Sequence, residues 1–206
     1  MDQSAALHKG ILFVVSGPSG TGKGTICKAL LDGDPALRLS ISTTTRSPRI
    51  GEVEGEHYFF LTKEIFSQMI REGQFLEWAE VYGNYYGTSR QFVLETLEQG
   101  SDVILEIDIQ GALQVKEKFP EAVLIFVSPP SMSELKERLI VRGTDSLAEI
   151  EKRLSYTADE LKLAGRYDYV VINDNLAKAV EKVRAIITAE KSRPWHFKAF
   201  FAQFGQ

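Results

Sequence analysis

The chain has 206 residues, of which 44% are hydrophobic and 25% charged, and its formal net charge is -4. This composition is typical of a soluble globular protein, and the length allows one α/β domain with small insertions and a substantial core. The net charge argues against a general role on nucleic acids or membrane surfaces, and no apolar run is long enough to span a bilayer.

The cysteine content and the N-terminal residues favour the cytoplasm. Cys27 is the only cysteine, so an intrachain disulfide is excluded and a reducing compartment is indicated. We expect its side chain to be a small buried hydrophobe on a helix. Residues 1–10 lack the apolar core of a signal peptide. These features predict a cytoplasmic protein with neither nucleic acid nor a membrane among its partners.

Strand-like apolar runs alternate with amphipathic segments along the chain. The runs are residues 11–15, 103–107, 123–127 and 169–172. Such alternation is typical of parallel strands joined by crossover helices. It therefore predicts an α/β fold with a doubly wound parallel sheet.

A glycine-rich stretch with a lysine follows the first of these runs. It reads Ser16-Gly17-Pro18-Ser19-Gly20-Thr21-Gly22-Lys23-Gly24-Thr25, and helical apolar spacing follows at Ile26, Ala29 and Leu30. Strand, glycine-rich turn, lysine and helix are together the context of a phosphate-binding P-loop. Its backbone N–H groups and the helix N-terminus would face a polyphosphate, and Lys23 would follow the transferred phosphoryl group. Residues 17–25 are therefore predicted to bind a nucleotide.

Gly24 departs from the strict P-loop pattern G-x-x-x-x-G-K-[ST]. It stands where a hydroxyl group usually ligates magnesium, and Thr25 follows one position later. We expect Thr25 to bond a phosphate oxygen, and Mg²⁺ to be held mainly by water and by the phosphates. No direct metal ligand is assigned, and direct contact by Thr25 or Glu106 stays open.

Two arginines lie close together in a turn that contains proline. Arg46 and Arg49 flank Ser47-Pro48, after a run of hydroxyl residues. Paired guanidinium groups suit a phosphate monoester, and hydroxyls of Ser42 and Tyr58 could complete its hydrogen bonding. The alternative is a solvated basic turn. After a P-loop, a second anion site is favoured.

Glu77 lies within an aromatic stretch, residues 75–86, that has strand character. A carboxylate can accept parallel hydrogen bonds from the N1–H and the exocyclic amine of guanine. Adenine presents an acceptor at N1 and would leave the carboxylate unpaired, which discriminates strongly in a buried site. Trp78 and Tyr85 are interpreted as core residues. Glu77 is the candidate for reading a guanine base.

Acidic and basic residues near later strand ends are further candidates. Glu106 and Asp108 follow the strand at 103–107, at the edge of the sheet that faces a ligand crevice. They could hold magnesium-bound water or orient the guanine lobe. For Glu106 a structural pairing with a nearby arginine is nearly as favoured as a catalytic role, so Asp108 is the stronger candidate. Arg138 and Arg142 share a helix face, and Arg153 follows on the next helix. They are surface arginines or groups that stabilise a transferred phosphoryl group on closure.

The sheet pattern is interrupted by insertions. Residues 40–89 are polar and aromatic, with helical spacing at Phe66, Met69 and Ile70, and residues 129–153 form a shorter departure. We predict a core domain of residues 1–39, 90–128 and 154–190. A lobe at 40–89 would bind the second substrate, and a small lid would lie at 129–153. An aromatic C-terminal tail follows at 191–206.

Several phrases resemble the guanylate kinase family, in order and at the family's spacing. They are GPSGTGKGT, STTTRSPRIGEVEGEHYFF, FLEWAEVYGNYYGTS, ILEIDIQG and SPPS…RLIVRGTDS, and the resemblance covers roughly residues 10–190. It implies a P-loop kinase fold in which the lobe at 40–89 binds GMP. It also implies transfer of the γ-phosphoryl group of ATP, with Mg²⁺, to GMP and to dGMP.

The resemblance also implies residue roles. It assigns the phosphate of GMP to Ser42, Arg46, Arg49, Tyr58 and Tyr86. It assigns the guanine base to Glu77 and Thr88, with Asp108 beside them; the family often has Ser at the position of Thr88, and the hydroxyl is kept. It assigns ATP to residues 17–25 and Asn173, and the moving phosphoryl group to Lys23, Arg142, Arg153 and Arg138. His8, His57 and His196 receive no role.

Alternatives remain for the function and for the tail. Gly24 slightly favours another nucleoside monophosphate kinase, and a non-catalytic guanylate-kinase-like binding module is a second possibility. In the tail, a face of phenylalanines at 197, 200, 201 and 204 must bury against something. We expect it to pack on the chain's own sheet domain, with a contact between copies in a homo-oligomer as the alternative.

Overall fold

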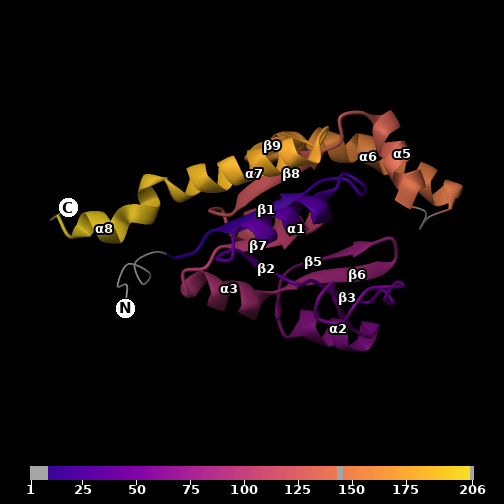
Figure 1. Cartoon of the computed structure of the whole chain (residues 1–206). Coiled ribbons are helices and arrows are strands. Elements are labelled where there is room, and N and C mark those ends of the chain that lie inside the picture. The colour runs from indigo at the N-terminus through magenta and orange to yellow at the C-terminus, as the bar shows by residue number, and fades with distance from the viewer. Residues whose placement is uncertain (1–8, 143–145, 205–206) are drawn as a thin grey trace.

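The computed structural model describes residues 9–142 and 146–204, without the side chains of Arg142, Lys198 and Ala199, and is built around a parallel sheet (Figure 1). The core strands are β1 (Leu12–Ser16), β2 (Arg38–Leu39), β7 (Val103–Glu106), β8 (Val123–Ser128) and β9 (Tyr169–Ile172). They are ordered β2-β7-β1-β8-β9, and every neighbouring pair is parallel. The predicted strands are confirmed. The short β2 was not predicted, because a pair of residues shows no periodic pattern.

Helices cover both faces of this sheet. Helices α1 (Lys23–Gly33) and α7 (Leu176–Lys191) pack on one face, and α3 (Arg90–Glu98) and α4 (Ile109–Lys118) on the other. The doubly wound α/β fold is thereby confirmed. Among the described residues, no helix combines the length and the apolarity needed to cross a membrane.

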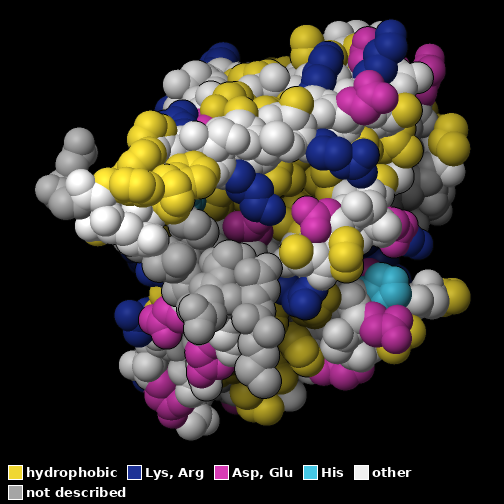
Figure 2. Space-filling model, turned by 60° about the vertical axis from the view of Figure 1, so that its left-hand side comes forward, with side chains coloured by type: hydrophobic (Ala, Val, Ile, Leu, Met, Phe, Trp, Pro, Cys, Tyr) yellow, Lys and Arg dark blue, Asp and Glu magenta, His cyan; other side chains and the backbone are white. Residues whose placement is uncertain are grey.

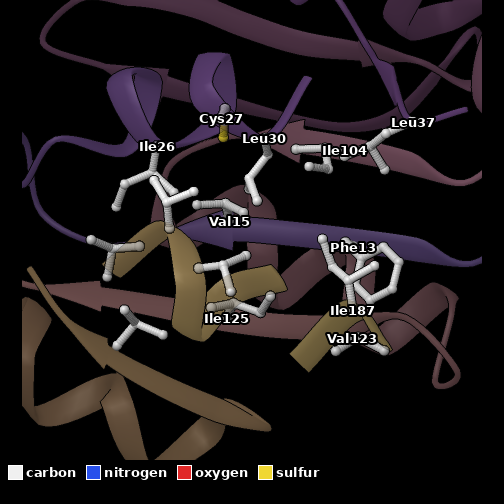
Figure 3. Packing of buried hydrophobic residues seen from close by; sticks show 14 of the residues in the cluster. Phe13, Val15, Ile26, Cys27, Leu30, Leu37, Ile104, Val123, Ile125 and Ile187 are labelled. Atoms are coloured by element: carbon white, nitrogen blue, oxygen red, sulfur yellow. The ribbon is translucent and has the colours of Figure 1, made fainter. Parts of the chain in front are cut away.

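Successive residues of β1 point into separate hydrophobic cores, because strand side chains alternate between the faces of a sheet. Phe13 and Val15 pack with α1 and α7, and Leu12 and Val14 belong to the core beneath α3 and α4. Figure 3 shows Phe13 and Val15 within the first core, where Cys27 is 1% exposed. The prediction for Cys27 is confirmed. Full burial of one such apolar side chain stabilises the fold by about 1.5–3 kcal/mol.

The inserted residues between α1 and α3 form a sheet of their own. Its elements are β3 (Thr43–Thr44), β4 (Phe59–Phe60), helix α2 (Lys63–Arg71), β5 (Phe75–Val81) and β6 (Asn84–Ser89), with strand order β4-β3-β6-β5. The stretch predicted as strand-like is a hairpin of β5 and β6. Tyr82 (φ 52°) and Gly83 (φ 79°) form its turn, in the left-handed conformation that tight hairpins use. Phe66 of α2 stacks on Phe75 with ring centroids 4.5 Å apart.

The predicted lid contains helix α5 (Met132–Arg142) and the start of helix α6 (Leu147–Lys162), which is followed by the 3-10 helix η2 (Leu163–Arg166). Ser146 and Glu149 form a capping box that starts α6. Leu135 and Leu139 of α5 pack on Ile150 of α6 in a small separate core. Because α6 continues without a break past residue 153, the proposed boundary between lid and core falls inside a helix.

Most of the phenylalanine face of the C-terminal tail does not pack on the sheet domain as we expected. A 3-10 helix η3 (Pro194–Phe197) and the short helix α8 (Lys198–Ala202) follow α7 and lead away from the sheet (Figure 1). Phe200, Phe201 and Phe204 are 44%, 47% and 71% exposed, and hydrophobic side chains project at this end of the molecule (Figure 2). For these three side chains the expectation is wrong, whereas Phe197 is half-buried and lines a cavity with Ile11, Ala36 and Asp102 of the sheet domain. A contact between copies of the chain stays a prediction.

Candidate active site

The glycine-rich turn between β1 and α1 forms an open cradle of backbone. Gly17 has φ 135°, and a Cβ there would lie 2.3 Å from the carbonyl oxygen of Val127. Gly22 has φ 89° and precedes α1, whose N-terminus receives no side-chain cap. The N–H groups of the first turn of α1 are therefore left for an anion. This geometry requires glycine at both positions and suits the predicted phosphate site.

Lys23 is held inside this cradle. Its Nζ donates to the carbonyl oxygens of Gly17 at 2.6 Å and Pro18 at 3.0 Å. Burial lowers the pKa of Lys23, and the negative charges of Glu106, Glu160 and Asp108 partly oppose this shift. The site therefore combines one compact cation with carboxylates from β7, α4 and α6. Glu160 was not among the predicted residues.

Two further side-chain hydrogen bonds hold the P-loop backbone in place. Thr21 Oγ1 donates to the carbonyl oxygen of Pro18 at 2.9 Å. The Asn173 amide, predicted to flank ATP, donates to the carbonyl oxygen of Thr21 at 2.8 Å. Asn173 is buried, and a Cβ at Gly22 would lie 2.5 Å from its Nδ2. The structure thus places Asn173 directly against the P-loop backbone.

The Glu106 carboxylate lies where many P-loops carry a hydroxyl group. A Cβ at Gly24 would lie 3.2 Å from its Oε2. Gly24 and Thr25 are both exposed at the start of α1. Among the described residues, no cluster of His, Cys, Asp or Glu side chains is arranged to hold a metal ion by itself. Carboxylates at this position suit a metal held through water and phosphate oxygens.

The predicted phosphate-binding residues of the inserted lobe come together around Arg46. The Arg46 guanidinium lies 5.3 Å from the ring centroid of Tyr58, and the rings of Tyr58 and Tyr86 are 6.0 Å apart. Ser42 lies nearby, because its carbonyl oxygen accepts the N–H of Phe59. The lobe therefore presents one guanidinium beside phenol groups, a suitable set for a phosphate monoester.

Glu52 holds the arginine turn in shape and was missed by the sequence analysis. Its carboxylate accepts from Arg46 Nη1 at 2.9 Å and from Nη2 at 2.8 Å. It also accepts the backbone N–H of Arg49 at 2.7 Å. The hydrogen bond to Arg46 lowers the pKa of Glu52. One carboxylate thus orients the side chain of Arg46 and the backbone that carries Arg49.

With GMP as the acceptor that the resemblance implies, replacing Glu52 with Gln is expected to raise KM for GMP about tenfold, because charge-assisted bonds that hold Arg46 are lost. KM for ATP should stay unchanged, and steady-state kinetics with each substrate varied measure both. Glu56→Gln, an exposed site in the same loop, is the matched control. A lower KM for GMP in Glu52→Gln would contradict this and show that Glu52 competes with the phosphate.

Glu77 is a buried carboxylate in the hairpin of the inserted lobe. It is 2% exposed, and the β5–β6 register places it opposite Thr88. Thr88 Oγ1 donates to its Oε1 at 2.5 Å. Burial raises the pKa of Glu77 to about 7, and the hydrogen bond from Thr88 opposes that shift. The two residues predicted to bind the base, Glu77 and Thr88, therefore lie side by side. Burying the charge of the Glu77 carboxylate costs free energy, and the packing of the core does not require a carboxylate there.

Asp108 begins helix α4 beside this pair. Its Oδ1 accepts the backbone N–H of Gln110 at 2.8 Å and of Gly111 at 3.1 Å, which caps the helix. Its charge also acts on both Glu77 and Lys23. Asp108 is therefore close enough to interact electrostatically with both Glu77 and Lys23, and its predicted place beside the guanine-binding residues stays a prediction.

The predicted lid arginines contact the P-loop side of the site. Arg153 Nη1 donates to Ser19 Oγ at 2.7 Å, and its guanidinium lies 5.0 Å from the ring centroid of Tyr82. Arg138 donates to the carbonyl oxygen of Asn173 at 2.8 Å and pairs with Glu134. Helix α6 and the β5–β6 turn thus meet over the P-loop, at the end of the sheet away from α8 (Figure 1). The side chain of Arg142 lies outside the described residues.

Two of the histidines lie within the described residues. His57 Nδ1 accepts the N–H of Val53 at 3.1 Å within the inserted lobe. His196 lies in the tail, beside Trp195, with ring centroids 3.4 Å apart. His8 falls outside the described residues.

Comparison with known proteins identifies the family. A family model described as guanylate kinase matches residues 9–190. The chain belongs to the guanylate kinase family. It is 61% identical over 185 residues to guanylate kinase of Caldanaerobacter subterraneus subsp. tengcongensis, covering 90% of each chain. It is 52% identical over 192 residues to guanylate kinase of Clostridioides difficile, covering 93% of this chain and 94% of the relative.

A solved guanylate kinase has the same fold. The crystal structure of guanylate kinase from Anaplasma phagocytophilum matches with a TM-score of 0.78 and 32% identity, over 92% of this chain and 90% of that one. The guanylate kinase family, the P-loop kinase fold and the prediction of a nucleoside monophosphate kinase are thereby confirmed. The tail after residue 190 lies beyond the match to the family model.

Proposed function

We propose that this guanylate kinase uses Mg²⁺ and transfers the γ-phosphoryl group of ATP to GMP and dGMP through the residues described above. The observation that carries the proposal is the buried, Thr88-bonded carboxylate of Glu77. A carboxylate with 2% exposure and a pKa raised by burial is unfavourable in a core unless a ligand uses it. The donor edge of guanine is such a ligand.

The phosphates of the donor nucleotide would lie on the P-loop. Backbone N–H groups at the start of α1 bind the phosphate oxygens, and Lys23 moves from the Gly17 and Pro18 carbonyls to the transferred group. Arg153 approaches from α6, where it already bonds Ser19. Because charge spreads over the phosphoryl oxygens in the transition state, these cations lower its energy without a covalent intermediate.

The acceptor would lie between the P-loop and the inserted lobe. Arg46, Tyr58 and Tyr86 hold its phosphate, with Ser42 and Arg49 completing the site. Glu77 and Thr88 bind the guanine. The assigned roles concern the phosphate and the base, so we expect binding not to depend on the 2′-hydroxyl of the sugar. This supports dGMP as a second acceptor.

Magnesium fits the acidic end of β7. Glu106 lies against Gly24 and Asp108 caps α4 nearby, so both carboxylates can accept hydrogen bonds from metal-bound water. The bound ion would neutralise charge on the β- and γ-phosphates during transfer. The chain's own contribution is to orient that water shell and to leave room for it at Gly24.

The proposal is tested with a panel of acceptors. GMP, dGMP, IMP, AMP, CMP and UMP are each offered with ATP and Mg²⁺, and ADP formation is measured. We expect kcat/KM for GMP to exceed that for AMP by at least about 10³-fold, because adenine leaves the buried carboxylate unpaired. Comparable rates with AMP would overturn the assignment of Glu77 to guanine.

A further inference from the structure

Helix α4 presents one face to the strand that carries Glu77. Gly111, Gln114 and Lys118 are spaced three and four residues apart, so they share this face. Gln114 Nε2 donates to the carbonyl oxygen of Trp78 at 2.8 Å, and Lys118 Nζ donates to that of Leu76 at 2.8 Å. The carbonyl groups on either side of Glu77 are therefore both bound by side chains of one helix.

These bonds satisfy backbone carbonyl groups of β5, a strand at the edge of its sheet. β5 is an edge strand of the inserted sheet, paired only with β6. The β5–β6 register shifts between Phe75 and Glu77, and the carbonyls of Leu76 and Trp78 both accept hydrogen bonds from α4 instead. Helix α4 follows β7 in the core, whereas β5 belongs to the inserted lobe. The bonds thus join the core to the lobe at the residue that reads the base.

Gly111 provides the surface on which the carboxylate lies. A Cβ there would lie 2.3 Å from Glu77 Oε2 and 3.0 Å from Glu77 Cδ, which is too close for real atoms. A helix interior ordinarily favours alanine over glycine. The glycine at this position therefore has a steric reason, which is to leave room for the Glu77 side chain.

The charges around Glu77 match this arrangement. Asp108 at the start of α4 raises the pKa of Glu77, and Lys118 near the end of the helix lowers it, although burial is the largest cause of its shift. Asp108 also fixes the first turn by capping it. Helix α4 therefore influences both where the carboxylate lies and how readily it ionises.

We propose that α4 sets the position of the Glu77 carboxylate, and that Gln114, Lys118 and Gly111 are positioning residues for guanine selection. The inference rests on the proposed function, because it assumes that Glu77 binds guanine. None of the three needs to touch the nucleotide. They act by holding the backbone on each side of Glu77 and by leaving space for its side chain.

The first test removes the helix-to-strand bonds without shortening the side chains. In Gln114→Met and Lys118→Met, KM for GMP is expected to rise about five- to tenfold each, with the preference for GMP over IMP reduced. IMP lacks the 2-amino group, so this ratio reports the second hydrogen bond of Glu77. KM for ATP should not change. Lys118→Arg, which keeps a donor and a charge, should restore KM for GMP toward the wild-type value.

The second test uses a matched pair of glycines. Gly111→Ala is expected to lower kcat/KM for GMP about 100-fold, because the new methyl group displaces a buried hydrogen-bonding carboxylate. Gly165→Ala is the control, since a Cβ at Gly165 meets nothing within 4 Å. It should leave the kinetics of both substrates unchanged.

The outcomes separate this inference from the proposed function. If wild-type protein does not distinguish GMP from IMP and AMP, the proposed function fails and the inference fails with it. If wild-type protein does distinguish them, and the Gln114, Lys118 and Gly111 variants keep its KM for GMP and its GMP-to-IMP ratio, only the inference is overturned. A fall in Tm with an unchanged ratio also overturns it, because that is a purely structural role. Should Gly111→Ala fail to fold, the methionine variants decide.

Discussion

Glu77→Gln is expected to lower kcat/KM for GMP by about 10³-fold, because a buried site built for a carboxylate then offers an amide donor to the donors of guanine. The amide has nearly the same shape, so the β5–β6 register and the bond from Thr88 should be retained. KM for ATP should stay within about twofold of wild type, because Glu77 lies in the inserted lobe and the phosphates of ATP are proposed to lie on the P-loop. Steady-state kinetics with GMP, IMP and ATP varied in turn provide the measurement.

The same substitution should stabilise the fold at high pH. Burial raises the pKa of Glu77 from 4.5 to about 7. Between these values the folded protein holds a proton that the unfolded chain has released, so the free energy of unfolding falls as the pH rises. Above pH 7 the folded state carries a buried charge, which costs about 3 kcal/mol from a shift of this size. A glutamine side chain carries no charge, so the Glu77→Gln variant avoids this cost.

Denaturant unfolding at pH 5 and pH 8 checks this expectation. The stability advantage of Glu77→Gln over wild type should be larger at pH 8. An equal difference at both pH values would show that Glu77 does not titrate in this window. The proposed guanine contact needs the ionised carboxylate of Glu77, so wild-type KM for GMP should also rise as the pH falls below 7. The phosphate of GMP titrates in both proteins, so the difference between their profiles isolates Glu77.

The parts of the site that depend on local sequence were predictable. The P-loop follows β1 directly, and its glycines, lysine and helix start lie within one short stretch of the chain. Arg46 and Arg49 are likewise fixed by a short turn. The doubly wound sheet could be predicted because β1, β7, β8 and β9 are continuous apolar runs, as strands covered on both faces require.

The residues that act across the fold were not predictable from their local patterns. An acidic residue such as Glu52 is unexpected in a proposed anion site, and only the structure shows it bonded to Arg46. From the sequence alone, Glu160 resembles an ordinary charged residue on the outer face of α6. In the structure it interacts with Lys23, and burial raises its pKa. Gln114 and Lys118 look like solvated helix residues until the edge of β5 lies beside them. Each depends on a distant element.

Tyr82 is another residue whose contacts could not be predicted from its local sequence. Its place in a hairpin turn follows from the sequence Tyr82-Gly83 only once β5 and β6 are known to pair. Its contacts with Arg153 and Tyr156 then depend on where α6 crosses the P-loop. In the tail, the pattern of phenylalanines predicted a buried face, but a pattern alone does not show whether any sheet surface remains uncovered.

The second large effect is expected at the P-loop lysine. Lys23→Met should lower kcat by about 10³-fold, as loss of a preorganised charge on the transferred group does in other enzymes. The Nζ atom lies among backbone carbonyls and near Glu106, Glu160 and Asp108. Without the cation these carboxylates face the triphosphate directly, so KM for ATP should rise as well. GMP binding, measured by calorimetry without ATP, should be unchanged because the inserted lobe is intact.

Lys23→Arg distinguishes charge from shape. In the proposed role the compact ammonium group of Lys23 moves from the Gly17 and Pro18 carbonyls, at 2.6 and 3.0 Å, to the transferred group, and a planar guanidinium is too broad to take both places. We therefore expect arginine to recover little of the lost kcat, although it restores the charge. Full recovery would mean that the net positive charge matters and the carbonyl pair does not. If Lys23→Met itself kept kcat within about tenfold of wild type, Arg153 and the α1 N-terminus would have to supply most of the stabilisation.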